Sequence, residues 1–221
     1  MHSRRPFFRP PSAAPLLACL LSFLPAAVST AGAAAANHAA PLAICTDYHC
    51  DRQQQVRLAP AAWSRIAALF SQVQNAAHER EQIRAAIALF EQSIGEQTET
   101  WQDKPRNEGD SSEPGQLDCI SESKNTTTYL HLLEQGQLLR WHRVLPPATR
   151  TRWLVQYHRA AVIEASGGAQ FAVDSWFEAN GEPPVVQPLK AWLASRPFAH
   201  RLDPIQPPAP TPAPSLPSPA P

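Results

Sequence analysis

Apolar side chains recur every three or four positions along two stretches in the first half of the chain, which predicts two amphipathic helices. The first stretch, residues 60–73, begins at a proline, a residue favoured in the first turn of a helix. Its apolar face comprises Trp63, Ile66, Ala67, Phe70 and Val73. The second runs from about Ala76 to Ile94, with the polar run 78–82 exposed and Gly95 expected to end it. Its apolar face comprises Ile83, Ile87, Phe90 and Ile94.

Residues 96–118 show no sustained period and separate these two helices from a third. A loop of this length inside a compact domain is usually functional or disordered, and this one leads directly to Cys119. Asp118 is expected to cap the third helix and Gly136 to close it. The apolar positions of this helix are Ile120, Tyr129, Leu130, Leu132 and Leu133. Cys119 therefore falls in the first turn, where unpaired N–H groups and the positive end of the helix dipole stabilise a thiolate.

The hydrophobic period changes from helical to alternating in the second half of the chain. Strands are expected over residues 138–144, 153–165 and 169–177. The turn between the last two is made by the SGG segment, residues 166–168. The loop 178–186 should turn the chain away from the sheet, and residues 189–196 should form a short closing helix with Leu189, Trp192 and Leu193 facing inward. The predicted fold class is α+β, with the N-terminal helices and a central helix packed on a small antiparallel sheet.

Composition supports a single domain with a sizeable core and argues against nucleic acid as a partner. The chain has 221 residues, 43% of them hydrophobic, and 19 acidic side chains balance 19 basic ones. Binding to a phosphate backbone needs a basic face, and no cluster of Lys and Arg occurs after the first ten residues. No cofactor is expected from any motif in the chain.

Both ends of the chain are expected to lie outside the folded domain. Residues 1–36 have a basic start, an apolar segment from Leu16 to Val28 and a run of small residues, which is the layout of a secretory signal peptide. The apolar segment is shorter than the about 20 residues that a membrane-spanning helix needs. We therefore expect cleavage between Ala31 and Asn37, export to the periplasm or the outside, and no stable membrane span afterwards.

Proline occupies nearly every second position from residue 204 onward. The tail 203–221 should therefore be extended and solvated, as a spacer or as a ligand for a partner in the cell envelope. The predicted organisation is completed by an N-terminal segment, residues 37–58, and one folded domain, residues 59–202.

The cysteines that follow the signal segment number three, and two of them are close in sequence. Export favours a disulfide between Cys45 and Cys50 that ties down the start of the chain. The alternative is a metal site, but four ligands within six residues match no usual zinc spacing, and we expect no metal. The ligands of that site would be Cys45, Asp47, His49 and Cys50. Cys119 is left without a cysteine partner, as a small buried apolar residue or as a reactive thiol.

The hairpin of residues 153–177 offers partners for a reactive thiol. If the turn centres near Ser166, His158 lies opposite Asp174 on one face of the sheet, and a shift of two residues would keep the two side chains diagonal neighbours. In such an arrangement the imidazole takes the proton of the thiol, and the carboxylate fixes the imidazole tautomer. Cys119, His158 and Asp174 are therefore the candidate catalytic residues.

Further residues near Cys119 have candidate roles. The N–H of Cys119 and the side chain of Gln116 are the candidate donors to an oxyanion. Asn125-Thr126-Thr127 matches a glycosylation sequon, but it lies inside a predicted helix, where we expect a polar face packed near the site. His142 stands between Trp141 and Arg143 near a strand end, which favours a surface position. Trp176 is expected to fill the core rather than to line the cleft.

The order GQLDC, helix, and then HRAAVIEASGGAQFAVDSW resembles the transglutaminase-like superfamily of papain-type folds, especially the bacterial transglutaminase-like cysteine proteinases. It is also similar to a group of exported bacterial proteins with an NTTTYL segment after the cysteine. The resemblance covers about residues 60–195. It implies that Cys119 is the nucleophile, His158 the general base and Asp174 the orienting carboxylate. The proteinase-like group usually has an acidic residue directly after the cysteine, where this chain has Ile120.

Two functions of different classes follow from these residues. The first is an exported cysteine-dependent hydrolase or acyl transferase acting on an amide bond in a peptide or in cell-wall material. The second is a catalytically inactive relative that uses the same cleft, or the Pro-rich tail, to bind a partner in the bacterial envelope.

Overall fold

A computed structural model of the chain describes residues 40–107, 113–152 and 156–197. The proposed signal peptide and the Pro-rich tail 203–221 lie outside the described residues, so both assignments stay predictions. No helix in the described part of the chain is long and apolar enough to cross a membrane.

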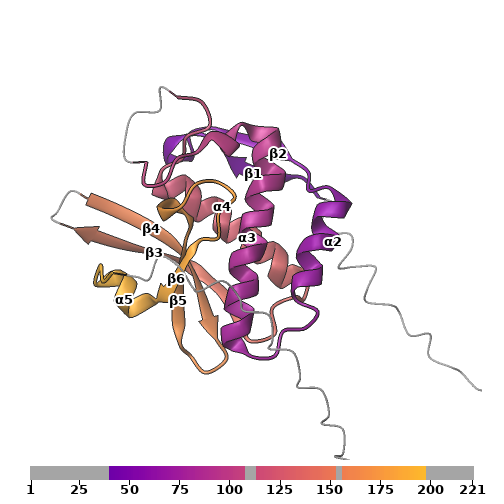
Figure 1. Cartoon of the computed structure of the whole chain (residues 1–221). Coiled ribbons are helices and arrows are strands. Elements are labelled where there is room, and N and C mark those ends of the chain that lie inside the picture. Colours follow the sequence, from indigo (N-terminus) through magenta and orange to yellow (C-terminus); the bar gives the residue numbers. More distant parts are fainter. Residues whose placement is uncertain (1–39, 108–112, 153–155, 198–221) are drawn as a thin grey trace, which may run out of the picture. The chain divides into compact units, whose positions relative to one another are not determined.

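The fold is α+β, as predicted, with helices and two antiparallel sheets (Figure 1). The helices are α2 (Pro60–Leu69), α3 (Ala76–Thr98), α4 (Cys119–Gln135) and α5 (Leu189–Leu193). The small sheet pairs β1 (Leu42–Cys45) with β2 (Gln53–Val56). The larger sheet has the order β3 (His142–Arg152), β4 (Gln156–Ala165), β5 (Gln170–Asp174) and β6 (Val185–Pro188). Short 3-10 helices are η1 (Tyr48–Cys50), η2 (Thr100–Gln102) and η3 (Ser175–Phe177).

The starts of the helices are fixed by local capping. The side chain of Asn75 accepts a hydrogen bond from the N–H of His78 at the start of α3, and Asp118 accepts one from Ser121 at the start of α4. Pro60 occupies the first turn of α2, where its missing N–H costs nothing. The predicted start points of all three helices are confirmed.

The prediction that Gly95 ends the second helix is wrong. Helix α3 continues to Thr98, and the chain leaves it at Glu99, whose φ is 63°. A Cβ atom on Gly95 would lie 2.8 Å from the Asn180 side chain and 3.0 Å from the backbone nitrogen of Trp101. The glycine therefore allows two other segments to approach the helix closely and does not act as a cap.

The sheet also differs from the predicted strands. Strand β3 begins at His142, later than residue 138, and runs through Pro146 and Pro147, where the pairing with β4 shifts register. Strand β5 ends at Asp174, because residues 175–177 form a 3-10 helix. The loop 178–186 does not lead away from the sheet, since its last two residues open β6, which pairs with β5.

The turn between β4 and β5 is where the sequence predicts it, but the pairing is displaced by two residues. Val173 faces Ala161, where a turn centred on Ser166 would put Phe171. By this register Asp174 stands opposite Ala160, so that His158 is its diagonal neighbour on the same face.

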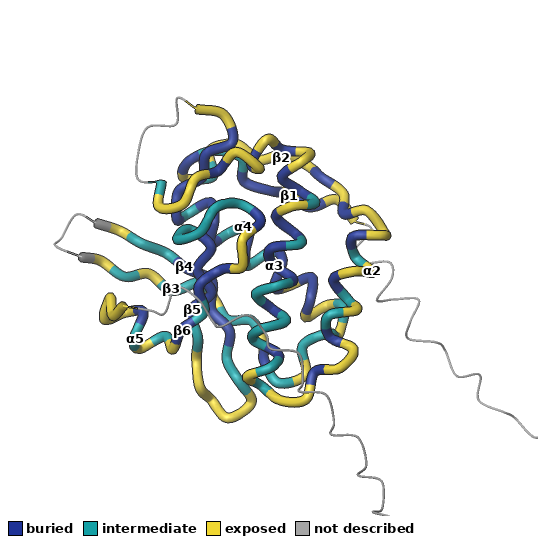
Figure 2. The backbone as a smooth tube through the Cα atoms, in the orientation of Figure 1, coloured by how far each residue is buried: buried dark blue, intermediate teal, exposed yellow. Residues whose placement is uncertain are grey.

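The two faces of the larger sheet bury different elements. Helix α4 packs on one face, and α3, α2 and side chains from the β1–β2 hairpin extend the same core, with α2 packed against α3. On the other face Ala160 and Ala172 contact Trp192 of α5. Because side chains alternate along a strand, His158 and Asp174 share the face of Ala160 and Ala172. Figure 2 shows buried stretches along α4 and the adjoining strands, whereas the turn between β4 and β5 is exposed.

Candidate active site

Cys119 is the first residue of α4, as the capping pattern predicts. The Ser121 N–H donates to Asp118 Oδ1 at 2.9 Å and closes the first turn around the cysteine. Cys119 is 8% exposed, and within the described residues it is the free cysteine. A thiol in this position lies beside unpaired N–H groups, which would favour its ionised form.

Cys45 and Cys50 form a disulfide, which confirms the prediction from compartment and spacing. The bond uses both sulfur atoms that the alternative metal site needed. No group of three or more His, Cys, Asp or Glu side chains in the described part of the chain could hold a metal ion. The disulfide joins the end of β1 to η1, so that the loop between them is a closed ring.

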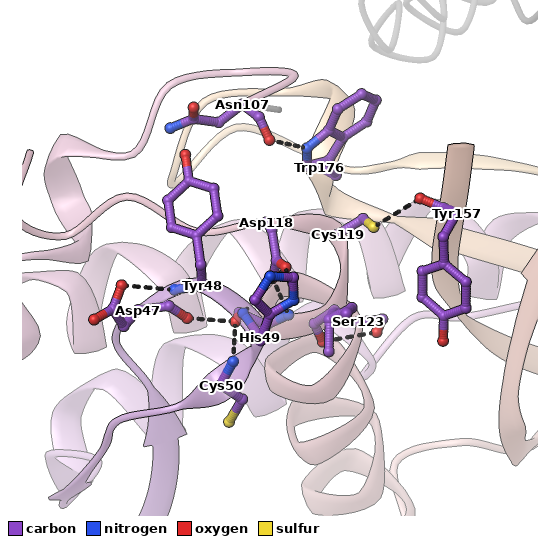
Figure 3. Close-up of polar contacts among 12 residues, drawn as sticks. Asp47, Tyr48, His49, Cys50, Asn107, Asp118, Cys119, Ser123, Tyr157 and Trp176 are labelled. Carbon is purple, nitrogen blue, oxygen red and sulfur yellow. Dashed lines mark hydrogen bonds and ion pairs between the residues drawn. The ribbon is translucent and has the colours of Figure 1, made fainter. Parts of the chain in front are cut away.

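This closed loop docks on the start of α4 (Figure 3). The N–H of His49 donates to Asp118 Oδ2 at 3.1 Å, and the N–H of Cys50 donates to the Ser121 hydroxyl at 2.9 Å. One turn further along, Asn125 accepts from the N–H of Cys45 at 2.8 Å and donates to its carbonyl oxygen at 3.0 Å. The side-chain amide of Asn125 is therefore buried and hydrogen-bonded through both its oxygen and its nitrogen, and the predicted polar packing face is confirmed. No local signal in the sequence indicated these partners.

The thiol of Cys119 contacts the backbone of β4 on both sides of His158. Its Sγ donates to the carbonyl oxygen of Tyr157 at 3.7 Å, and the N–H of Arg159 donates to the sulfur. In an antiparallel sheet these are the two groups with which a neighbouring strand would bond. Strand β5 ends at Asp174, opposite Ala160, so the cysteine occupies the strand position that β5 leaves open.

His158 and Asp174 meet directly. The imidazole Nε2 lies 2.7 Å from Asp174 Oδ2, and the aspartate is only 2% exposed. With Nε2 donating to the carboxylate, the neutral ring carries its lone pair on Nδ1, as a general base requires. Among the hydrogen bonds of the described residues, none joins the thiol to the imidazole. The structure thus brings two of the three candidate residues together and sets the third against the backbone of Tyr157 and Arg159, which flank His158.

Aromatic side chains surround the imidazole. Its ring centroid lies 4.5 Å from that of Trp176, 5.4 Å from Phe177 and 5.6 Å from Trp192. Trp176 therefore packs directly against the imidazole, and the prediction that it merely fills the core is wrong. Its indole N–H donates to the carbonyl oxygen of Asn107 at 2.9 Å, which ties the loop before α4 to these aromatic side chains.

Burial raises the pKa of the Cys119 thiol to about 11. The N–H groups of Arg159 and of Cys119 itself oppose this rise, whereas the negative charges of Asp118 and Asp174 add to it. The resting thiol is consequently protonated at neutral pH. Any nucleophilic chemistry here needs a base at the moment of attack, because a preformed thiolate is not stabilised.

Gln116 is buried in the loop before α4, where its side chain holds three segments of that loop together. Its Nε2 donates to the carbonyl oxygen of Gln102 at 2.7 Å, and its Oε1 accepts from the N–H of Lys104 at 3.3 Å and from the Asn107 amide. The amide nitrogen has one further hydrogen, so the role of Gln116 as an oxyanion donor stays a prediction.

Three carboxyl groups are buried behind the start of α4: Glu91 of α3, Asp103 after η2 and Glu122 of α4. Burial raises the pKa of Glu91 to about 8 and that of Asp103 to about 6. Burial also raises the pKa of Glu122 well above its ordinary value, and the charges of the other two add to the rise. Asp103 and Glu122 share a hydrogen bond, so the cluster retains protons near neutral pH.

His142 is buried, so the predicted surface position is wrong. Its Nδ1 lies 2.8 Å from Glu79 Oε1, and neither side chain is accessible to solvent. Glu79 belongs to the run 78–82 that was predicted to be exposed, and this too is wrong for Glu79. The pair has a structural role, because it joins the start of β3 to the first turn of α3.

Comparisons of the chain with models of protein families, with curated proteins and with solved structures found no match. The resemblance to the transglutaminase-like superfamily therefore rests on the motif residues alone.

Proposed function

We propose that this chain is an exported cysteine-dependent hydrolase or acyl transferase that acts on an amide bond in a peptide or in cell-wall material, with a transglutaminase-like fold. The observation that carries the proposal is that His158 pairs with Asp174 at 2.7 Å and lies on β4, the strand whose backbone bonds the Cys119 thiol. The disulfide Cys45–Cys50 supports an extracytoplasmic location, because such bonds persist in oxidising compartments.

The proposed chemistry is general-base assisted, since the resting thiol is protonated. His158 Nδ1 accepts the thiol proton as Sγ attacks the carbonyl carbon, and Asp174 stabilises the imidazolium that forms. The N–H of Cys119 and a second donor hold the oxyanion. The imidazolium then gives its proton to the leaving amine, and the C–N bond breaks to leave a thioester on Cys119. Water resolves this thioester in a hydrolase, and a second amine resolves it in an acyl transferase.

Alkylation of Cys119 by iodoacetamide at neutral pH tests the proposal. We expect His158→Ala to slow labelling by at least about tenfold, because the base that assists the protonated thiol is lost. The matched control is His131→Ala, which removes an exposed histidine from α4. Cys119→Ser should abolish labelling of the peptide that carries residue 119, as read by mass spectrometry. Equal, slow labelling of native and His158→Ala protein would count against the proposal.

Turnover is tested by intact mass after incubation with peptide and cell-wall amide libraries. A thioester adduct is expected on native protein and on His131→Ala, and it should be absent from Cys119→Ser. Its release as free acid or as a new amide separates the hydrolase from the acyl transferase.

A second candidate function is an inactive binding module of the envelope. The burial of the thiol and its pKa of about 11 favour this alternative, because both lower the reactivity of Cys119. It predicts normal folding of Cys119→Ala, undiminished recovery of an envelope partner and no adduct with any amide in the library.

A further inference from the structure

The carboxylate of Asp174 has a second donor besides His158. The indole N–H of Trp192 lies 2.7 Å from Asp174 Oδ2, the same oxygen that the imidazole Nε2 approaches at 2.7 Å. Trp192 is fully buried. An indole can only donate, so its N–H group fixes the direction of the carboxylate oxygen between the two rings.

Trp192 reaches this position from α5, and neighbouring residues hold its indole in place. On one side Ala160 and Ala172 pack against it, and their small side chains leave room for the large ring on this face of the sheet. On the other side Arg150 places its guanidinium carbon 4.4 Å from the indole ring centroid and donates a hydrogen bond to the Trp192 carbonyl oxygen. Arg150 is also the cross-strand neighbour of His158 on β3. One residue therefore adjoins both the histidine of the dyad and the tryptophan that contacts its aspartate.

We propose that Trp192 is a positioning residue, which holds the Asp174 carboxylate and through it fixes the tautomer and orientation of the His158 ring. This inference rests on the proposed function, because it adds a residue to the same proposed site. The reason is geometric. The indole N–H holds Oδ2 in one direction, so that this oxygen accepts from His158 Nε2 and the lone pair of the neutral ring stays on Nδ1.

The matched variants Trp192→Phe and Trp101→Phe test the inference. Phenylalanine keeps an aromatic ring but lacks the N–H donor. Trp101 is 62% exposed and belongs to η2, outside the sheet that carries the dyad. In Trp192→Phe we expect NMR titration of the nitrogen-labelled protein to show both tautomers of the neutral His158 ring in place of the single Nε2–H tautomer. The alkylation rate of Cys119 should fall by about tenfold, as expected for one lost hydrogen bond to a charged group. Trp101→Phe should change neither quantity. A folded Trp192→Phe protein whose His158 ring keeps the single Nε2–H tautomer would overturn the inference.

A measurement on the native protein keeps the inference testable if Trp192→Phe does not fold. The chemical shift of the Trp192 indole N–H should follow the same titration curve as the His158 ring, because both groups share one oxygen. An indole signal that stays constant through that titration would overturn it.

Both titrations are independent of turnover, which separates the two proposals. If the indole signal follows His158 in the Cys119→Ser protein, the positioning role stands. If His158→Ala then leaves alkylation of the native cysteine unchanged, the proposed function fails while the positioning role survives.

Discussion

Helix α3 carries two buried glutamates, Glu79 in its first turn and Glu91 three turns later, and their acidities shift in opposite directions. Burial raises the pKa of both. At Glu79 the hydrogen bonds from His142, Arg140 and Trp141 outweigh burial, and the net pKa is lowered. At Glu91 burial prevails, and the pKa rises to about 8.

The difference lies in the neighbours of each carboxylate. Glu79 accepts the N–H of Arg140 at 2.7 Å, that of Trp141 at 3.0 Å and the ring of His142 at 2.8 Å. Glu91 accepts the N–H of Gly181 at 2.9 Å, but the charge of Asp103 raises its pKa further. A buried carboxylate is thus stable as an anion only where the hydrogen bonds that it accepts outweigh burial and neighbouring negative charge.

The largest effect is expected for Glu79→Gln. The three partners of Glu79 all donate to it, so an NH₂ group at this position would face other donors and have no acceptor. The free energy of unfolding should therefore fall by about 3 kcal/mol. Urea unfolding at neutral pH measures this, and Glu96→Gln on the exposed side of the same helix is the control. A loss no larger than that of the control would remove the contrast between the two sites.

At pH 6 a smaller effect, with the opposite sign, is expected for Glu91→Gln. The folded pKa of about 8 lies above the ordinary 4.5, so the native chain keeps a proton there that the unfolded chain releases. Stability is therefore fully present below about pH 4.5 and is lost as the pH rises towards 8, by about 1.4 kcal/mol per pH unit for one such group. Glutamine mimics the protonated acid, so at pH 6 the variant should be more stable than the native protein by about 2 kcal/mol.

At pH 5 the same substitution should change little. The measurement is thermal unfolding of both proteins across this pH range. If the two curves run parallel from pH 5 to pH 8, Glu91 is not the titrating group.

The smallest effect is expected for His142→Gln. One of the donors to Glu79 is weakened while the two backbone N–H groups remain, so stability should fall by about 1 kcal/mol. Because the folded pKa of Glu79 is lowered, its contribution is present above about pH 4.5 and is lost as the pH falls through the folded value. The variant should therefore lose stability at a higher pH during acid titration. His131→Gln, at an exposed histidine, serves as the control; an equal acid midpoint in both variants would contradict the prediction.

Local signals sufficed for part of this fold. Asn75 and Asp118 start helices because each presents an oxygen to an N–H group within three residues, and such pairs are visible in any sequence. Gly95 and the strand β6 escaped prediction for a different reason. At Gly95 the need for a glycine comes from the close approach of Trp101 and Asn180. Strand β6 is defined by its pairing with the edge of β5.

The candidate site shows the same division. The alternation of the hairpin and its short turn led to His158 and Asp174, which lie within one supersecondary unit. Asn125 was expected on a packed polar face and Trp192 facing inward, but the partners of both residues were not predicted. The partner of Asn125 lies 80 residues away, at Cys45, and Trp192 contacts Asp174 only after the chain has added β6 and turned back as α5. Contacts of that range leave no periodicity or spacing to follow.

The β1–β2 hairpin shares the main core through Leu42, Ile44 and Val56, and its ring of residues 45–50 supplies two amide donors to the start of α4. Expression fragments without the hairpin would lose the two donors to Asp118 and Ser121 beside Cys119 and would expose the hydrophobic core to water. Any shortened version intended for biochemical work should therefore start upstream of Leu42. It should be expressed in an oxidising compartment, where the disulfide Cys45–Cys50 can form.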